Sequence, residues 1–242
     1  MNLNIAGIIM DCLTRFPSEM ELLLAGYAAG GEESRACAFR LDPAPWIDTI
    51  TDETCQGPVN SEFYALSAAL GEQLPRYGRL QTHGVAIQYE GKSYIFAAPS
   101  GTGKTTRALL WQKHLGTDKV RIINGDKPIL WFKDEEVLAC GSPWGGKEGF
   151  QENVCVPLGG ICLLRRSERN TIRKISGQEF FDTYTSQVQM PKDPLMQLAT
   201  LRLIEELYSK VPAYMLENDR SEQGVIVAFE TLTGKTYPKP SI

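Results

Sequence analysis

The sequence predicts an α/β protein in which a mixed β-sheet of hairpins forms the core, a small α+β lobe comes before it and helices come after it. Three observations lead to this prediction. Pairs of short apolar runs separated by a turn are typical of β-hairpins. A glycine-rich stretch stands between an apolar run and a segment with helical spacing. Helix-start and helix-stop signals follow residue 165. We expect residues 1–78 to be the lobe and residues 79–242 the core with its helical extension.

Composition excludes several classes of protein. A chain of 242 residues with 43% hydrophobic side chains can bury a substantial core. The net charge of -4 argues against a protein that coats nucleic acid. Asp11 and Arg15 interrupt the first apolar stretch before it could span a bilayer, and no early positive charge precedes it. The six cysteines form no C-x-x-C pair, so we expect mostly reduced thiols in a cytoplasmic protein without membrane or nucleic-acid partners.

The lobe is predicted to contain two strands and a helix. Its short apolar runs, residues 5–10 and 22–25, are separated by a polar stretch, as in a pair of strands. A helix is expected over residues 61–73, with Ser61 as its N-cap. Its apolar side chains recur at helical spacing: Phe63, Leu66 and Leu70. This lobe contains no recognisable chemistry.

Residues 79 to about 165 read as strands with one inserted helix. Apolar and polar residues alternate over 85–89, a turn with a glycine follows, and 94–98 is a second apolar run. These features predict a hairpin, and residues 129–132 and 137–140 predict another.

A glycine-rich loop and a helix follow the first hairpin. Ala108, Trp111 and Leu115 fall on one face of the expected helix, which Gly116 closes. A buried-looking strand over 120–123 comes next and runs into three turn-forming residues, Asn124-Gly125-Asp126.

The last part of the chain is predicted to contain one strand and several helices. The strand is expected near 171–175, and Ser176 with Glu179 forms a capping box for the helix after it. The last helix is expected over 222–232, where Gly234 ends it.

A longer helix is predicted between these two. Asp193 and Pro194 occupy the positions of an N-cap and a first helical residue, and Pro212 ends the pattern. Four leucines supply its mostly apolar face: Leu195, Leu198, Leu203 and Leu207.

The stretch from Ala98 to Thr105 fits the phosphate-loop pattern at every fixed position but the first, where Ala98 replaces glycine. Glycines 101 and 103 would let backbone N–H groups point inward around a phosphate. Lys104 would supply a mobile charge to the β- and γ-phosphates, and the Thr105 hydroxyl is the expected Mg²⁺ ligand. A chance glycine-rich turn is the alternative, but the flanking strand and helix patterns favour binding of a nucleoside triphosphate with Mg²⁺. The expected nucleotide contacts are Ser100, Gly101, Thr102, Gly103, Lys104, Thr105 and Thr106.

Two further residues are candidates for the chemistry. Asp126 should lie at the carboxyl end of its strand, near the loop, where it could hold Mg²⁺ or accept a proton. A turn-forming role is the alternative for this aspartate. His83 precedes the strand that leads toward the loop, and its imidazole could take a hydroxyl proton or contact a transferred phosphoryl group. A lone histidine is, however, more often structural.

Residues 141–149 are too rich in glycine for regular structure and are interpreted as a substrate or lid loop. Lys147 could meet a phosphate, and Glu148 could steer a hydroxyl or a metal. Trp144 is the third candidate for substrate contact. A surface turn with Trp144 packed inward explains the same residues equally well.

Three segments of this chain resemble, in their order, the HPr kinase/phosphorylase and phosphoenolpyruvate carboxykinase group. The similarity covers about residues 80 to 165 and implies a mixed sheet with hairpins and one helix after the phosphate loop. It also implies that Lys104 contacts phosphate, that Thr105 and Asp126 lie on the metal side, and that His83 lies near the transferred group. Lys127 stands where HPr kinases have a second aspartate. The matching segments are Thr82-His83-Gly84-Val85, Ser100-Gly101-Thr102-Gly103-Lys104-Thr105-Thr106 and Asn124-Gly125-Asp126.

The resemblance implies an ATP- and Mg²⁺-dependent kinase whose acceptor is a serine of a protein or peptide, or else a hydroxyl of a small molecule. Asp126 or His83 would be the base, and copies of the chain could associate. Lys127 favours one alternative, a nucleotide-binding regulatory or peptide-binding module without transferase activity. The Gly-Thr-Gly-Lys-Thr-Thr run favours the other, a carboxykinase-like lyase.

Overall fold

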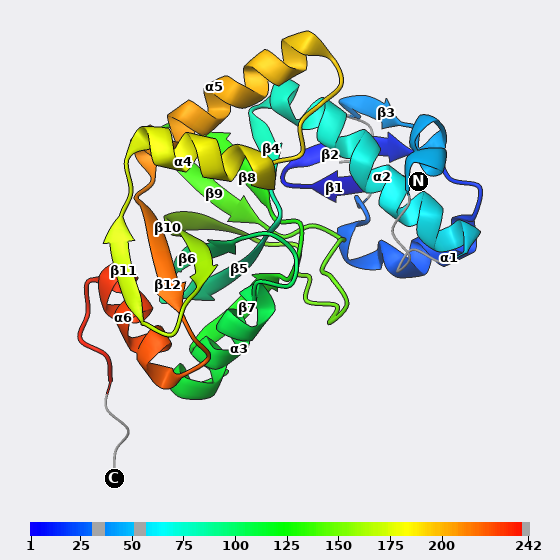
Figure 1. The fold of residues 1–242 in the computed structure, drawn as a ribbon. Coiled ribbons are helices and arrows are strands. Elements are labelled where there is room, and N and C mark those ends of the chain that lie inside the picture. The colour runs from blue at the N-terminus through cyan, green and yellow to red at the C-terminus, as the bar shows by residue number, and fades with distance from the viewer. Residues whose placement is uncertain (31–36, 51–56, 239–242) are drawn as a thin grey trace.

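Two β-sheets organise the part of the chain that the computed structural model describes, residues 1–30, 37–50 and 57–238. A three-stranded sheet belongs to the lobe, and a nine-stranded sheet belongs to the core. Figure 1 shows the lobe sheet beside α2 and the larger sheet between two pairs of helices. The prediction of a mixed α/β protein is confirmed at this level.

The lobe sheet begins with a tight hairpin. Strands β1 (Asn2–Ile5) and β2 (Ile8–Cys12) are antiparallel, and β3 (Phe39–Leu41) lies parallel to β2. The strand predicted at 22–25 is therefore wrong. Pro17 starts helix α1 (Pro17–Leu23), and the short 3-10 helix η1 (Ala25–Tyr27) follows it. Met20 and Leu24 are buried one helical turn apart, which is the spacing of a helix, whereas Leu22 of the apolar run is 82% exposed.

Helix α2 (Pro58–Gln73) starts three residues earlier than predicted. Gly57 is its N-cap and Pro58 its first residue, so Ser61 is not the cap. Proline is favoured at this position because its fixed φ suits a first helical turn and its missing N–H would have had no partner there. The 3-10 helices η3 (Ala44–Thr49) and η4 (Leu74–Tyr77) flank α2 in the chain.

The core sheet contains both predicted hairpins, which are confirmed. Strand β5 pairs antiparallel with β6, and β8 pairs antiparallel with β9. The strand order is β4-β8-β9-β10-β6-β5-β7, with β12 on β10 and β11 on β12. Sequence reasoning left β4, β10 and β12 unassigned. The strands are β4 (Arg79–Gln81), β5 (Gly84–Tyr89), β6 (Lys92–Ala97), β7 (Val120–Asn124), β8 (Ile129–Lys133), β9 (Glu136–Cys140), β10 (Cys155–Arg166), β11 (Thr171–Lys174) and β12 (Ala213–Asn218).

Strand direction decides which loops can meet. Strand β10 is parallel to both β6 and β12, while β5 is antiparallel to both β6 and β7. Hence β6, β7, β10 and β12 all run the same way, and their carboxyl ends share one edge of the sheet. The amino end of β5 lies at that edge as well. We call it the carboxyl edge.

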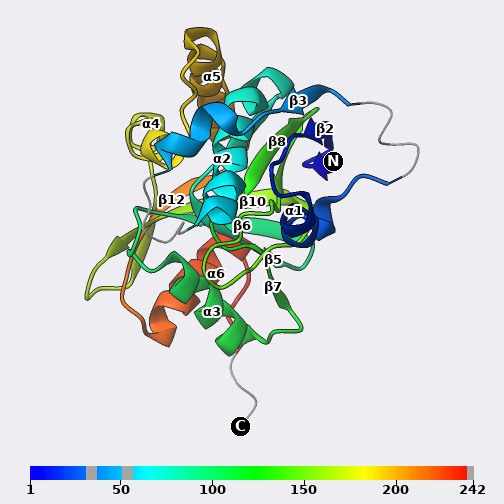
Figure 2. The ribbon, with the colours of Figure 1, turned by 90° about the vertical axis from the view of Figure 1, so that its right-hand side faces the viewer.

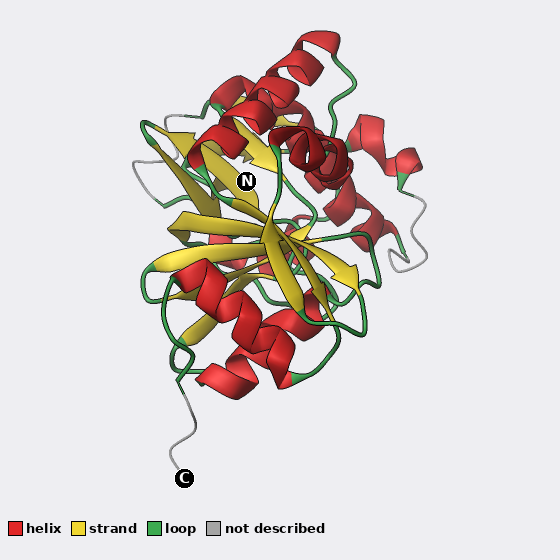
Figure 3. Cartoon of the chain, turned by 60° about the vertical axis from the view of Figure 1, so that its left-hand side comes forward, coloured by secondary structure: helices red, strands yellow, loops and turns green. Residues whose placement is uncertain are grey.

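Helices cover both faces of the core sheet (Figures 1 and 3). Helices α3 (Lys104–Leu115) and α6 (Glu222–Thr233) pack on one face around the fully buried Trp111. Helices α4 (Gly177–Tyr184) and α5 (Pro194–Lys210) pack on the other. The 3-10 helix η5 (Thr185–Gln187) follows α4. The predicted starts at Ser176 and Asp193 and the predicted ends at Gly116 and Gly234 are confirmed.

The apolar face predicted for α5 is partly wrong. Leu195 and Leu198 are 72% and 46% exposed. The buried residues of this helix are Thr200, Ile204 and Leu207, so its packing face begins only at Thr200. The strong N-cap, in which the Asp193 carboxylate accepts the N–H groups of Leu195 and Met196 at 2.7 and 3.2 Å, holds the first turn without core contact.

Three of the five described cysteines are thiols, as predicted, and the other two form a disulfide that was not predicted. Cys140 and Cys155 are bonded, because they are register partners on the antiparallel strands β9 and β10. Cys12, Cys37 and Cys162 are thiols, and Cys55 lies outside the described residues. Within the described ranges, no helix has the length and apolar character needed to cross a membrane.

Candidate functional site

A cavity of about 790 Å³ opens at the carboxyl edge of the core sheet. Residues from the ends of β6 and β7, the start of β5 and the loop after β9 line it, and the lobe closes another side. We call it the loop cavity. Its lining includes the sequence-predicted residues His83, Ser100, Gly101, Gly103, Lys104, Thr105, Thr106, Asp126, Lys147 and Glu148.

The 98–105 loop joins β6 to α3 in a conformation that depends on two glycines. Gly101 and Gly103 have φ angles of +76° and +112°, which side-chain-bearing residues rarely adopt. A Cβ atom at either position would meet nothing within 4 Å. The backbone conformation, and not crowding, therefore requires glycine there. Gly103 is the N-cap of α3, so the unpaired N–H groups of the first helical turn lie beside the loop.

Lys104 lies folded back on the loop that precedes it. Its ammonium donates to the carbonyl oxygens of Ala98 at 2.8 Å and Pro99 at 3.4 Å. The side chain is 8% exposed, and burial lowers its pKa while the nearby Asp126 opposes that shift. The charge is thus held at the cavity wall by neutral carbonyl groups. Thr102 does not line the loop cavity but faces a neighbouring cavity of about 450 Å³.

Asp126 is held by a turn that Asn124 builds. The buried Asn124 side-chain oxygen accepts the backbone N–H groups of Asp126 at 3.0 Å and Lys127 at 2.7 Å. Its amide nitrogen donates to the Ser142 carbonyl at 2.9 Å, and the Ser142 hydroxyl donates to the Lys127 carbonyl at 2.6 Å. The Asp126 carbonyl accepts the N–H of Gly84 at 2.9 Å. Asn124 therefore performs the turn-forming role, and the Asp126 carboxylate is left facing the cavity.

His83 and Asp126 lie side by side on the cavity wall and form a pair. The distance between Nε2 of His83 and Oδ1 of Asp126 is 3.5 Å. Burial lowers the pKa of His83. The positive charges of Lys104 and Lys127 lower this pKa further, and the Asp126 carboxylate opposes the shift. The imidazole is consequently neutral near pH 7, a state in which it can accept a proton.

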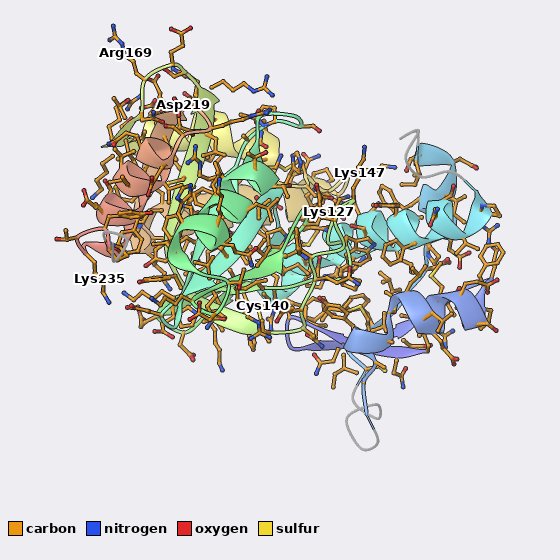
Figure 4. The ribbon with its side chains drawn as sticks, turned by 90° about the horizontal axis from the view of Figure 1, so that it is seen from below. Lys127, Cys140, Lys147, Arg169, Asp219 and Lys235 are labelled. Atoms are coloured by element: carbon orange, nitrogen blue, oxygen red, sulfur yellow. A yellow bond between two sulfur atoms is a disulfide. The ribbon has the colours of Figure 1, made fainter. Side chains whose placement is uncertain are left out.

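The loop after β9 separates its three candidate residues. Lys147 and Glu148 line the cavity together with Lys127, and both lysines are labelled in Figure 4. Trp144 is 1% exposed, and its indole N–H donates to the carbonyl of Phe63 in α2 at 2.8 Å. The prediction that Trp144 contacts substrate is therefore corrected: it packs the loop onto the lobe, as the alternative interpretation had it.

Sequence reasoning missed part of the cavity wall. The lobe, in whose sequence no chemistry is recognisable, contributes Thr49, Ile50, Tyr64 and Ala68 to this wall. Figure 2 shows α2 running above the ends of the core strands. The Lys127 ammonium lies 5.7 Å from the centre of the Tyr64 ring. These residues carry no local sequence signal, because their place follows from the packing of two distant segments.

Arg220 was missed for a different reason. It follows strand β12 at the carboxyl edge and lines both the loop cavity and the neighbouring 450 Å³ cavity. A basic residue after a strand end would have been a candidate phosphate contact. Because β12 was not predicted, Arg220 could not be placed.

Comparisons with known proteins do not assign the chain to a family. No protein-family model matches the chain, and no curated protein matches it. A solved structure similar to it is the Hpr(Ser) kinase/phosphatase from Coxiella burnetii, at 10% sequence identity and a TM-score of 0.37. The match covers 64% of this chain and 88% of that chain. A likeness this distant carries no argument about fold or activity. The chain's own strands and helices establish it as a mixed α/β protein.

Proposed function

We propose that this chain is an ATP- and Mg²⁺-dependent kinase that transfers the γ-phosphoryl group to a hydroxyl, that of a serine in a protein or peptide. A small-molecule hydroxyl is the other acceptor class. One observation carries the proposal. The 98–105 loop, the Lys104 ammonium and the His83–Asp126 pair, which are distant in sequence, line a single cavity.

The loop offers what a triphosphate needs. Backbone N–H groups of the loop and of the first turn of α3 would bind phosphate oxygens, and the positive end of the helix favours the same charge. Lys104 would exchange its two carbonyl acceptors for the β- and γ-phosphate oxygens. Charged acceptors make stronger hydrogen bonds than neutral ones, so this exchange favours nucleotide binding.

Thr105 and Asp126 fit a Mg²⁺ ion by their chemistry. Hydroxyl and carboxylate oxygens are hard donors, and Mg²⁺ takes one or two protein ligands together with waters and substrate phosphates. Among the described residues no cluster of three or more His, Cys, Asp or Glu could hold a metal alone. We therefore propose that the ion arrives with the nucleotide. When bound it would neutralise charge on the phosphates.

The transfer step needs an acceptor for one proton. The oxygen of the incoming hydroxyl forms a bond to the γ-phosphorus while the bond from that phosphorus to the bridging oxygen breaks, and ADP leaves. The hydroxyl proton passes to the His83–Asp126 pair, whose atoms lie 3.5 Å apart. Placing these groups and neutralising charge would supply most of the rate enhancement.

The decisive test is nucleotide binding by calorimetry. The wild-type chain should bind ATP in the presence of Mg²⁺, and Lys104→Ala should weaken binding about 10- to 100-fold, the cost of losing charged hydrogen bonds. Lys113→Ala is the matched control, because Lys113 is an exposed lysine in the last turn of the same helix. Absence of binding by folded wild-type protein, or equal binding by Lys104→Ala, would contradict the proposal.

A nucleotide-binding module without transferase activity is the second candidate, and Lys127 favours it. This residue lines the cavity where a second acidic residue would be expected. If the second candidate is correct, the chain should bind ATP with Mg²⁺ but transfer no phosphate to serine-containing peptides. Phosphoserine formation detected by mass spectrometry would exclude it.

A further inference from the structure

The 141–149 loop leaves the core sheet at a disulfide. Cys140 is the last residue of β9 and Cys155 is the first residue of β10, and the two are bonded register partners on these antiparallel strands. The bond therefore closes the segment 141–154 at its base. That segment carries Lys147 and Glu148 to the loop cavity. A chemical change at the disulfide is thus placed to affect the candidate site.

The backbone pairing between β9 and β10 is short. The strands are joined by three register pairs, Cys140 with Cys155, Ala139 with Val156 and Leu138 with Pro157. In an antiparallel pair of strands, only every second register pair exchanges backbone hydrogen bonds. Few such bonds therefore join the two strands, and the covalent bond adds a large share of what keeps the base of the loop closed.

The closed loop supports the turn that carries Asp126. The N–H of Gly125 donates to the Phe150 carbonyl at 2.9 Å, and the N–H of Lys127 donates to the Trp144 carbonyl at 3.2 Å. These bonds tie the residues on both sides of Asp126 to the segment that the disulfide closes. Opening of that segment would free both N–H groups and loosen the position of the Asp126 carboxylate.

The two bonded cysteines differ in their access to solvent. Cys155 is exposed, whereas Cys140 is fully buried in the apolar cluster that the lobe and the core share. An attacking thiolate can therefore approach the bond from the side of Cys155. Exposed disulfides are reduced more readily than structural disulfides in a protein interior. This asymmetry favours a bond that can be opened and closed in the folded chain.

We propose that the Cys140–Cys155 bond is a redox switch operated by a dithiol reductant, and that the oxidised state holds the 141–149 loop closed on the loop cavity. The effect of this switch on phosphoryl transfer rests on the proposed function, whereas its effect on the loop does not.

Reduction proceeds by two exchange steps. A thiolate of the reductant bonds to the Cys155 sulfur while the bond to Cys140 breaks, and the electron pair leaves on the Cys140 sulfur, which takes a proton. The second thiol of the reductant then displaces the Cys155 thiol. Two thiols form in this chain, and one disulfide forms in the reductant.

Reduction should open the loop without unfolding the core. The bonded cysteines are 15 residues apart in the chain, and removing a cross-link of this length gives the open segment more conformational entropy. We expect the loop to open about 10- to 100-fold more often in the reduced chain. The contact of Trp144 with the Phe63 carbonyl remains, so the loop should close again between openings.

The test is hydrogen exchange of the full chain, followed by NMR in oxidised and in reduced dithiothreitol. The reporters are the backbone N–H groups of Gly125, Gly141 and Glu152, which donate to carbonyls on the other side of the loop base or on the neighbouring strand. Their exchange should be about 10- to 100-fold faster in the reduced chain, while exchange in the paired strands β11 and β12 should not change. Thiol alkylation with mass spectrometry records the state of the bond.

Two exposed cysteines provide a matched pair of variants. Cys155→Ala should show the fast exchange of the reduced chain in both conditions. Cys37→Ala removes an exposed thiol of the lobe and should keep the wild-type response to dithiothreitol.

Equal exchange in the oxidised and reduced wild-type chain would overturn the proposal, and so would a bond that dithiothreitol leaves intact in the folded chain. A response that persists in folded Cys155→Ala would overturn it too, and the wild-type comparison decides alone if that variant does not fold. Failure of the kinase proposal is read separately, because neither state would then phosphorylate a serine peptide while exchange would still respond to reduction. If the chain is a kinase, the oxidised state should be faster, and equal rates would remove the regulatory role.

Discussion

The two walls of the loop cavity differ in what they contribute. The core wall supplies the charged and proton-accepting groups, His83, Lys104 and Asp126, from positions that strand ends fix. The lobe wall supplies Tyr64 and Ala68 from the side of a helix. The reactive groups on this scaffold are thus placed by local chain geometry, whereas the shape of the opposite wall depends on packing across the molecule.

The largest effect on activity is expected when the carboxylate of the core wall is removed. Asp126→Asn should lower phosphoryl transfer about 10²- to 10⁴-fold, because the pair with His83 loses its charge while the turn built by Asn124 remains. The measurement is kcat with a serine peptide that the wild-type chain phosphorylates. Asp134→Asn is the control, at an exposed turn where asparagine tolerates the positive φ of 52°. Activity of Asp126→Asn close to that of the control would remove Asp126 from the mechanism.

The next largest effect is expected when the packing of the 141–149 loop on the lobe is removed. Trp144→Ala should lower the free energy of unfolding by about 3 to 5 kcal/mol, since a fully buried indole between loop and lobe is lost. Urea denaturation measures this change. Trp144→Phe keeps an aromatic ring but leaves the Phe63 carbonyl without its donor, so a smaller loss of about 1 to 3 kcal/mol is expected. A negligible loss in Trp144→Ala would show that this contact does not hold the lobe.

The pH dependence of catalysis tests the electrostatics of the core wall. The pKa of His83 lies below its ordinary 6.5, so as proton acceptor it is active above that depressed pKa and loses activity as the pH falls through it. The acid limb of kcat/KM should therefore lie below pH 6.5. Lys127→Gln removes a charge that lowers this pKa, so it should move the limb upward. An acid limb that stays the same in His83→Asn would belong to another group.

The smallest effect is expected for a substitution in the lobe wall alone. Tyr64→Leu should raise the KM for the peptide or the nucleotide about two- to fivefold, because Lys127 loses the aromatic face 5.7 Å from its ammonium. Tyr64→Phe keeps that face and should leave KM near the wild-type value. Steady-state kinetics decide between them, and equal KM values for the leucine and phenylalanine variants would show that the ring face has no part.

Local signals in the sequence predicted much of the core. The two hairpins, the helix that Gly116 closes and the Asp193 cap were all visible, because turn glycines and capping side chains act over a few residues. Strand β10 was not visible, although it is the longest strand described. Its Gly159 lies at a register shift and against the Tyr94 ring, so the central strand lacks an alternating pattern there.

The candidate site divides in the same way. The 98–105 loop and Asp126 could be proposed from spacing, since both follow strands that the hydrophobic pattern reveals. The partner of Trp144, the Phe63 carbonyl, is 81 residues away in the chain. The backbone hydrogen bonds between residues 81–83 and 187–189 likewise join segments about a hundred residues apart, which no periodicity in the sequence predicts. Tertiary packing decides these features, and a single sequence does not display it.

The mixed composition of one apolar cluster has a practical consequence for dissecting the molecule. Side chains of the first two strands and of α2 pack in that cluster with Ile129, Cys140 and Trp144 of the core. A fragment beginning at residue 79 would leave those three side chains facing water, and we expect it to aggregate. Biochemistry on this protein is therefore best done with the lobe attached, even when only the nucleotide is of interest.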